Sequence, residues 1–157
     1  MSLGLNLIDA KVSFDNSTIV NHINLSIPTG EATAIIGPAA SGKSVLFKYI
    51  LDLLDGQEPK LEFFDMLKEK VEPQPGEIGV MFQENALFDS MTALENISFQ
   101  IVNTLSYSKL KALEVADKLL SEMGLSAATG NKYPSELSGG MQKRIALARA
   151  LSSKPKL

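Results

Sequence analysis

GPAASGKS at residues 37–44 is the stretch that decides the fold. It matches the pattern GxxxxGK[ST] in full. The apolar run Ala32–Ile36 precedes it and predicts a strand buried on both faces. Apolar residues at helical spacing follow over Ser44–Leu54 and predict an amphipathic helix. The order strand, loop and helix is the context that a phosphate-binding loop requires, and it disfavours a chance Gly/Ser turn.

The parts of this motif each have a chemical reason. Glycines let the backbone curl so that successive N–H groups point at phosphate oxygens. Lys43 supplies a positive charge to the β and γ phosphates, and Ser44 offers a hydroxyl to Mg²⁺. The helix that follows adds its positive N-terminal end. The predicted phosphate-binding residues are Gly37, Pro38, Ala39, Ala40, Ser41, Gly42, Lys43 and Ser44.

A second motif, LSGGMQKR at residues 137–144, also places glycines before a predicted helix, Met141–Leu151. The first N–H groups of such a helix are free, and the hydroxyl of Ser138 adds a donor, so the motif can receive an anion. A flexible helix cap is an equally good interpretation of this motif taken alone.

The rest of the chain predicts strands first and helices later, which favours an α/β core with a helical insertion. Thr92 and Glu95 form a capping box at the start of a helix to about Leu105. Gly124 is expected to cap the helix Lys109–Met123. The predicted strands are Leu5–Phe14, Ile23–Ile27, Leu61–Phe64 and Ile78–Phe82.

Composition excludes several classes of protein. The 157 residues carry a net charge of −3 with both signs mixed along the chain, which argues against a general nucleic-acid binder. The absence of cysteine excludes a disulfide framework and thiolate metal sites. The N-terminus does not read as a signal peptide. No stretch approaches the roughly 18 to 20 apolar residues of a membrane span. If the protein serves transport, the membrane part is expected to be another chain.

The two motifs together resemble the ABC ATPase family. The resemblance implies a P-loop NTPase (RecA-like) fold with an N-terminal antiparallel β part and a helical subdomain. The implied division is 1–83 for the β-rich core, 84–137 for the helical subdomain and 138–157 for the signature motif and its helix. Gln83 lies where the family's Q-loop glutamine lies, and Phe14 where an aromatic residue stacks on adenine. The alternatives are core packing for Phe14 and an ordinary exposed polar residue for Gln83.

The resemblance also implies partners and cofactors. Two such domains form a head-to-tail dimer, expected to be a homodimer, with ATP between the phosphate loop of one and the signature of the other. Ser44 and Gln83 are implied to contact Mg²⁺. Residues 84–137 are implied to dock on a separate transmembrane permease at the cytoplasmic face of the cell membrane. The residues implied to act on the partner's ATP are Ser138, Gly139, Gly140 and Gln142.

A finer resemblance lies in VMFQENALFDSMTALENISF, residues 80–99, and YPSELSGGMQKRIALARAL, residues 133–151. Both segments are similar to the ATPase subunits of bacterial lipid transporters of the Mla, or mammalian-cell-entry-linked, type. Amino-acid and lipoprotein-releasing ABC ATPases share parts of them. Lipid transport is therefore one expectation for the substrate.

The chain departs from the family after Lys154-Pro155-Lys156-Leu157, where the Walker B strand, its Asp-Glu pair and the switch histidine would follow. Its one histidine, His22, precedes the phosphate loop and cannot be that switch. Asp89 and Glu95 receive no catalytic role. We expect an N-terminal, C-terminally incomplete piece of a longer ATPase that alone hydrolyses ATP negligibly. Its two apolar strands beside the phosphate loop and Gln83 would lack neighbours.

Three other functions compete with an ATPase subunit of a transporter. A non-transport ABC protein would usually carry a coiled-coil insertion or fused ATPase domains, and neither is visible. A small-molecule kinase would explain the phosphate loop but not LSGGMQKR. An inert truncated product, which binds ATP at most, is the third.

Overall fold

The computed structural model describes residues 2–15 and 17–157. It separates into two units, residues 1–73 and residues 74–157. Each unit has a hydrophobic core of its own. The three-part division expected from the sequence stays a prediction.

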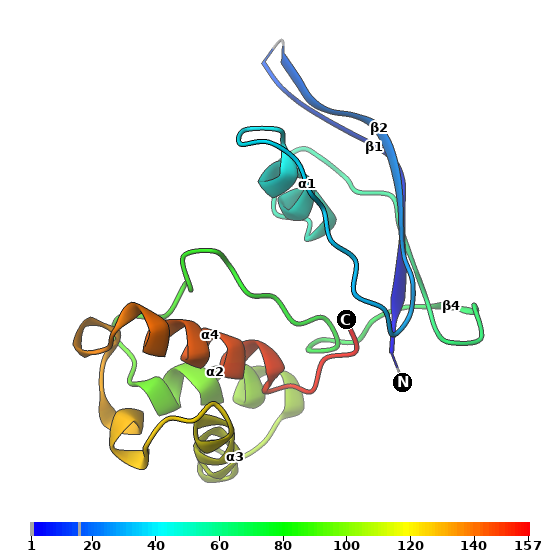
Figure 1. Ribbon diagram of the computed structural model, residues 1–157. Coiled ribbons are helices and arrows are strands. Elements are labelled where there is room, and N and C mark those ends of the chain that lie inside the picture. Colours follow the sequence, from blue (N-terminus) through cyan, green and yellow to red (C-terminus); the bar gives the residue numbers. More distant parts are fainter. Residues whose placement is uncertain (1, 16) are drawn as a thin grey trace. The chain divides into compact units, whose positions relative to one another are not determined.

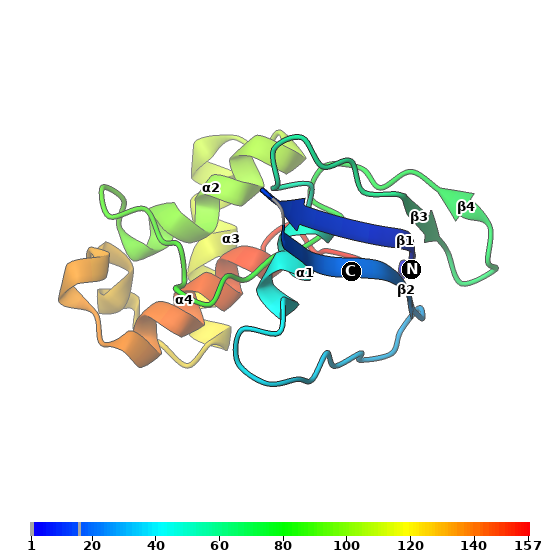
Figure 2. The ribbon, with the colours of Figure 1, turned by 90° about the horizontal axis from the view of Figure 1, so that it is seen from above.

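The first unit is built on an antiparallel sheet with the strand order β2-β1-β3-β4 (Figure 2). Central strand β1 pairs with β2 on one side and with β3 on the other. Register shifts interrupt the β1–β2 pairing, and such irregularities bend and twist a ribbon. The strands expected at Leu5–Phe14, Ile23–Ile27 and Leu61–Phe64 are confirmed, although β2 begins six residues earlier than expected, at Ser17, and β4 was not expected. The strands are β1 (Gly4–Phe14), β2 (Ser17–Ile27), β3 (Leu61–Phe64) and β4 (Lys70–Val71).

Helix α1 (Lys43–Ile50) supplies the other half of this unit's core. Leu46 and Tyr49 are buried and belong to one apolar cluster with Leu7, Val12 and other residues of the hairpin. The helix ends at Ile50 rather than at the expected Leu54, because the chain turns into a left-handed residue at Asp52. The first unit therefore fixes the helix that follows the phosphate loop against the β1–β2 hairpin.

Two expected strands are absent, and the prediction for them is wrong. Neither Ala32–Ile36 nor Ile78–Phe82 pairs with any strand that the structure describes. The side chain of Ile36 is 92% exposed instead of buried. A strand buried on both faces needs a neighbour on each side, and without neighbours an apolar run has no ladder to join. The expectation that these two runs lack strand neighbours stays a prediction.

The second unit is helical, with helices α2, α3 and α4 packed around one core (Figure 1). Ile97, Leu120 and Ile145, one from each helix, are fully buried in it. Two short 3₁₀ turns, η1 and η2, connect α3 to α4. The elements are α2 (Ala93–Leu105), α3 (Lys109–Glu122), η1 (Ala127–Asn131), η2 (Pro134–Glu136) and α4 (Gly139–Leu151).

Local signals set the helix ends, as expected. The hydroxyl of Thr92 accepts from the N–H of Glu95 at 3.3 Å, and the Glu95 carboxylate accepts from the N–H of Thr92 at 2.9 Å. This is the predicted capping box, which satisfies two otherwise free donors. Gly124 follows α3 with φ +70°, a left-handed conformation typical of a helix C-cap. Helix α4 begins at Gly139, two residues before the expected Met141.

The segment before Gln83 runs beside the last residues of the chain. The N–H of Gly79 donates to the carbonyl of Leu157 at 2.8 Å, and the Ser153 hydroxyl donates to the carbonyl of Gly76 at 2.7 Å. A side chain at Gly79 would lie 2.7 Å from Pro155, so this approach requires glycine. Within the described residues, none of the helices is long and apolar enough to cross a membrane.

Candidate nucleotide-binding site

The phosphate loop holds a conformation that depends on Gly42. This residue has φ +86°, and a Cβ on it would lie 3.1 Å from Cγ2 of Ile19 and 3.2 Å from the Ile19 carbonyl oxygen. An L side chain would therefore be strained and crowded at once. Glycine at this position lets strand β2 approach the loop closely.

Lys43 lies at the centre of the curled loop. Its ammonium donates to the carbonyls of Gly37 at 2.9 Å and Pro38 at 2.6 Å, and to the Ser41 hydroxyl at 3.3 Å. These are all neutral partners, so the positive charge has no carboxylate near it in the loop. A polyphosphate would supply the counter-charge that the loop itself lacks.

The N-terminus of α1 is open. Its N-cap, Gly42, offers no side-chain acceptor, so the first N–H groups of the helix are not capped by a side chain. Among the described residues the Ser44 hydroxyl has no hydrogen-bond partner. Free N–H groups, the helix dipole and one ammonium together fit an anion such as a nucleotide phosphate.

A hollow of about 330 Å³ brings the predicted adenine residue to the phosphate loop. The ring of Phe14 is 45% exposed and lines this hollow with residues 40–45. Ile19, which the sequence did not single out, lines it as well and is 40% exposed. The sequence shows Ile19 only as an apolar residue near the turn of the β1–β2 hairpin, which does not predict a place in this hollow. The lining residues are Phe14, Ile19, Ala40, Ser41, Gly42, Lys43, Ser44 and Val45.

The second motif lies in the helical unit and forms a different kind of helix start. The Ser138 hydroxyl caps α4 by accepting from the N–H of Met141 at 3.3 Å. A Cβ added at Gly139 or Gly140 would meet nothing within 4 Å, so both glycines face open space. The Gln142 amide donates to the carbonyls of Pro134 at 2.8 Å and Leu137 at 3.4 Å. It therefore holds the turn before the motif, a role that the sequence did not reveal.

Gln83 also belongs to the second unit, and its side chain is exposed. It lies in a turn that the N–H of Asn85 closes on the carbonyl of Phe82 at 3.1 Å. The expected strand before it is not formed. Gln83 therefore sits on a loop whose shape is set by contacts within residues 74–157.

Two residues without an assigned catalytic role, Glu95 and His22, have structural partners. Glu95 caps α2, and the Thr92 N–H that donates to it lowers the pKa of its carboxyl. His22 bonds Asp9 at 2.6 Å, which lowers the pKa of that carboxyl. The described residues contain no group of three or more His, Cys, Asp or Glu that could hold a metal. A metal at the phosphate loop would have to be held largely by phosphate oxygens together with Ser44.

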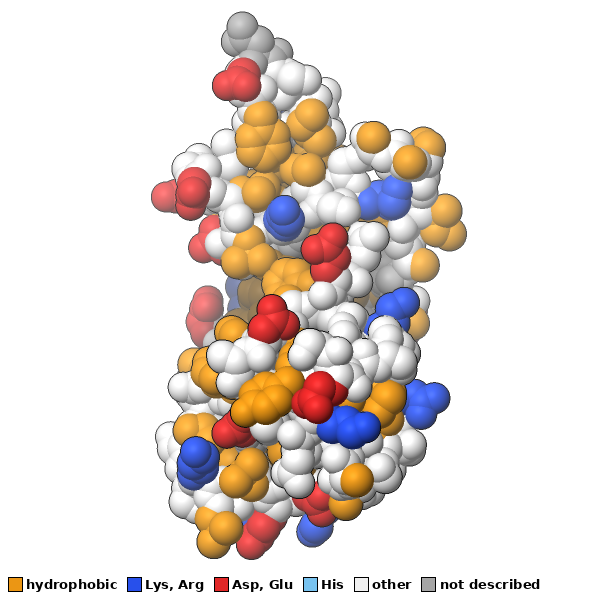
Figure 3. All heavy atoms as spheres, turned by 90° about the vertical axis from the view of Figure 1, so that its left-hand side faces the viewer, with side chains coloured by type: hydrophobic (Ala, Val, Ile, Leu, Met, Phe, Trp, Pro, Cys, Tyr) orange, Lys and Arg blue, Asp and Glu red, His pale blue; other side chains and the backbone are white. Residues whose placement is uncertain are grey.

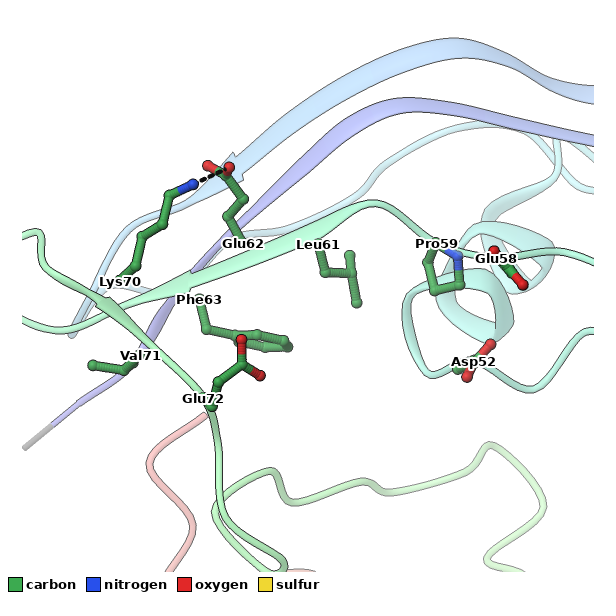
Figure 4. Close-up of a pocket in the computed structure, with 9 residues that line it drawn as sticks. All are labelled: Asp52, Glu58, Pro59, Leu61, Glu62, Phe63, Lys70, Val71 and Glu72. Carbon is green, nitrogen blue, oxygen red and sulfur yellow. Dashed lines mark hydrogen bonds and ion pairs between the residues drawn. The ribbon is translucent and has the colours of Figure 1, made fainter.

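A larger hollow, of about 640 Å³, lies under strands β3 and β4 of the first unit (Figure 4). Carboxylates of Asp52, Glu58 and Glu62 line it, and Lys70 pairs with Glu62 at 2.5 Å. None of the motif residues lines this hollow. On the face shown in Figure 3, acidic and basic side chains are interspersed with apolar ones.

Comparison with known proteins decides the family. The profile of the ABC transporter family matches residues 20–157. The chain belongs to the ABC transporter family. It carries an ATP-binding domain of that family, with the α/β cassette fold that the sequence predicted.

Several relatives place the chain among ABC transporter ATPases. It is 38% identical over 156 residues to the glutamine transport ATP-binding protein GlnQ of Escherichia coli (strain K12), covering 92% of this chain and 61% of that protein. It is 32% identical over 157 residues to the sulfate/thiosulfate import ATP-binding protein CysA of the same organism, covering 99% and 43%. The chain thus spans about half the length of these curated relatives.

A solved ABC cassette has the same fold. The ATP-binding cassette MJ0796, a dimer in a post-hydrolysis state bound to ADP and phosphate, matches with a TM-score of 0.78 and 28% identity. The match covers 96% of this chain and 70% of that one. The family of this chain thus includes a dimeric, nucleotide-bound cassette.

Proposed function

We propose that this chain is the ATP-binding part of an ABC transporter and that it holds ATP in the hollow between Phe14 and the phosphate loop. One observation carries the proposal: a phosphate loop, an ammonium bonded to neutral groups of that loop and an exposed aromatic ring line one cavity. Phe14 would stack on adenine, and Lys43 would exchange its loop carbonyls for the β and γ phosphates.

We further propose that Mg²⁺ accompanies the phosphates. Ser44 offers a hydroxyl, and Gln83 offers a side-chain carbonyl from its exposed loop. Both are hard oxygen ligands of the kind that Mg²⁺ takes beside phosphates and water. Bound magnesium would neutralise phosphate charge, and the two residues would orient it. ATP hydrolysis is assigned to none of the residues in this chain.

The signature motif would act on a nucleotide held by another copy of the domain. Gly139 and Gly140 face open space, and Ser138 presents its hydroxyl at the start of α4. An open helix N-terminus of this kind can receive a phosphate brought from outside. The dimeric cassette in the comparison supports association of two such domains, and we propose a head-to-tail pair of identical chains.

A permease would dock on helix α2. A hollow of about 490 Å³ lies on its outer side, lined by Met91, Phe99, Val102 and polar residues. Phe99 and Val102 are 37% and 38% exposed. Apolar side chains in a hollow with a polar rim are typical of a protein-binding site. The partner would be a separate membrane chain, which would hold this domain at the cytoplasmic face of the membrane.

The substrate is left open between two expectations. The amino-acid sequences of residues 80–99 and 133–151 favour a lipid transporter of the Mla type. The relatives reported above are named for transport of glutamine and of sulfate or thiosulfate, and they do not favour lipids. The permease, rather than this domain, would select the substrate.

A calorimetric ATP titration tests the proposed site. Lys43→Ala should weaken ATP binding about 100-fold, because a hydrogen bond to a charged group contributes about 1.5–3 kcal/mol. Lys48→Ala, which removes an exposed lysine from the same helix, should leave the affinity unchanged. Equal affinity in Lys43→Ala and the unmodified chain would contradict the proposal.

Co-purification from detergent-solubilised membranes tests the docking surface. Phe99→Ser should release the chain from a membrane permease that co-purifies with the unmodified chain, because it places a hydroxyl in an apolar contact. Leu110→Ser alters an apolar side chain on α3 that is 72% exposed and outside the hollow, so it should leave the complex intact. Release by Leu110→Ser alone would place the contact elsewhere.

A further inference from the structure

Arg149 of helix α4 forms hydrogen bonds with the loop that carries Gln83. Its guanidinium donates through Nη1 to the carbonyl of Ala86 at 2.8 Å and through Nη2 to the carbonyl of Asn85 at 2.9 Å. These contacts join residues 63 and 64 positions apart in the chain. A planar fork bonded to two successive carbonyls fixes the loop in direction as well as in distance.

The surroundings of Arg149 are those of an arginine held in one position by its neighbours, and not those of a solvated surface arginine. Its side chain is partly buried, and this burial lowers its pKa. No carboxylate pairs with it among the described residues. Its Cζ lies 5.7 Å from the ring centre of Phe88, and that ring packs on Phe99 at 4.8 Å. Two carbonyls and an aromatic face therefore replace a carboxylate as partners of the charge.

The loop itself would not keep its shape unaided. Asn85 and Ala86 have φ values of +62° and +48°, left-handed conformations that non-glycine residues seldom adopt. Two such residues in succession persist only where the surroundings hold them. The buried Asn85 Oδ1 has no hydrogen-bond partner among the described residues. Arg149 supplies the constraint at this point of the loop.

Asn96 holds the far end of the same loop. Its fully buried amide bonds both the N–H and the carbonyl of Phe88, at 2.8 Å and 3.1 Å, and donates to the carbonyl of Met91 at 3.0 Å. Arg149 is the second side chain that bonds this loop, at Asn85 and Ala86, between the contacts of Asn96 and Gln83.

We propose that Arg149 is a positioning residue for Gln83, setting where the glutamine side chain stands when magnesium nucleotide binds. Helix α4 begins at the signature motif and reaches Arg149 ten residues after Gly139. At about 1.5 Å per residue the helix spans about 15 Å between them. The Gln83 loop and the signature motif are thereby attached to one helix.

The role of Arg149 rests on the proposed contact of Gln83 with magnesium, so the first readout is the magnesium dependence of binding. A fluorescent ATP analogue is titrated with Mg²⁺ and with EDTA. Gln83→Ala should reduce the gain in affinity from Mg²⁺ about fivefold, or about 1 kcal/mol. Arg149→Met should do the same, and the double variant should lose no more, because both changes remove one interaction. Lys118→Met, on the exposed face of α3, is the charge control.

The second readout is hydrogen exchange, which needs no nucleotide. Arg149→Met should speed exchange in peptides covering residues 82–91 about tenfold and leave α2 and α3 unchanged. Arg149→Lys keeps the charge without the fork and should restore neither readout fully.

The outcomes separate the two proposals. An Arg149→Met chain with unaltered magnesium dependence, where Gln83→Ala has lost it, would overturn the role of Arg149. The role of Arg149 would also be overturned if Gln83→Ala left the magnesium dependence of binding unaltered. Faster hydrogen exchange throughout residues 74–157 in Arg149→Met would overturn it as well. If the unmodified chain binds no analogue at all, the proposed function fails, and exchange at residues 82–91 alone decides whether Arg149 fixes the loop.

Discussion

Helix α1 follows a glycine N-cap and helix α4 begins with two glycines, yet the two N-termini are built differently. At α1, Gly42 is crowded by Ile19 and has a positive φ, and a lysine ammonium lies in the loop it closes. At α4, Gly139 and Gly140 face open space, and a serine caps the helix. The first is an uncapped helix start beside a hollow with its own positive charge, whereas the second is a serine-capped start whose glycines face open space.

This difference shows how one family can use the same feature twice. A cradle with an uncapped helix end and a lysine suits a phosphate held by the chain itself. An open end without a cradle suits a phosphate that another chain presents. Changes at the start of α1 should therefore alter the ATP affinity of the single chain, and changes at the start of α4 should not.

Matched glycine substitutions at the two helix starts should give the largest difference in ATP affinity. Gly42→Ala puts a Cβ against Ile19 at a positive φ, which costs about 1–2 kcal/mol and should weaken ATP binding about tenfold or more. Gly139→Ala meets nothing within 4 Å and should leave ATP affinity unchanged. Calorimetry and thermal unfolding measure both variants. Similar losses in the two would show that the glycines are equivalent.

Removal of the Phe14 ring should show whether the hollow at the phosphate loop recognises the base of ATP. Phe14→Ala should weaken ATP binding about tenfold, because stacking of a base on an aromatic ring contributes about 1–3 kcal/mol. The affinity for inorganic triphosphate, which has no base, should stay the same. Phe14→Tyr should keep ATP affinity. Equal losses for ATP and triphosphate would mean that Phe14 shapes the loop instead of the base site.

Substitution of the capping residue Ser138 should give a smaller effect, on stability instead of on ATP affinity. Ser138→Ala should lower the stability of the helical unit by about 1 kcal/mol, because the N–H of Met141 loses its acceptor. ATP affinity of the single chain should not change. Urea unfolding followed by helical circular dichroism measures the first effect and calorimetry the second. A loss of ATP affinity would place Ser138 in the chain's own site.

The smallest effect concerns α2, a third helix start with a carboxylate in its cap. Hydrogen bonds from Thr92 lower the pKa of Glu95 in the folded chain. The stabilisation is therefore present above the ordinary glutamate pKa and is lost as the pH falls through the lowered folded value. Unfolding temperatures between about pH 6 and pH 3 should fall less steeply in Glu95→Gln. Identical slopes would show that the cap does not titrate.

Sequence reasoning succeeded where the determinants are local. The capping box at Thr92 set the start of α2, and the phosphate-loop pattern set the start of α1. It failed where a residue depends on distant neighbours. Ala32–Ile36 reads as a buried strand, but strand formation needs partners that a pattern does not contain.

The same limit applies to the site. The motif residues of the loop were read directly, whereas Ile19 lines the hollow only because β2 folds onto Gly42. Gln142 bonds carbonyls of residues that precede the motif, and Arg149 bonds carbonyls more than 60 residues away. Contacts between side chains and distant backbone leave no spacing pattern in the sequence.

A mixing experiment tests most directly whether the two helix starts serve different nucleotides. Lys43→Ala removes the charge of the cradle, and Gly139→Asp places a carboxylate at the open end without a steric clash. With ATP and Mg²⁺, each variant alone should stay monomeric in analytical ultracentrifugation while the unmodified chain dimerises. An equimolar mixture should recover dimer, because it contains one intact cradle facing one intact signature. A mixture no more associated than its components, or loss of ATP binding by Gly139→Asp alone, would contradict the account.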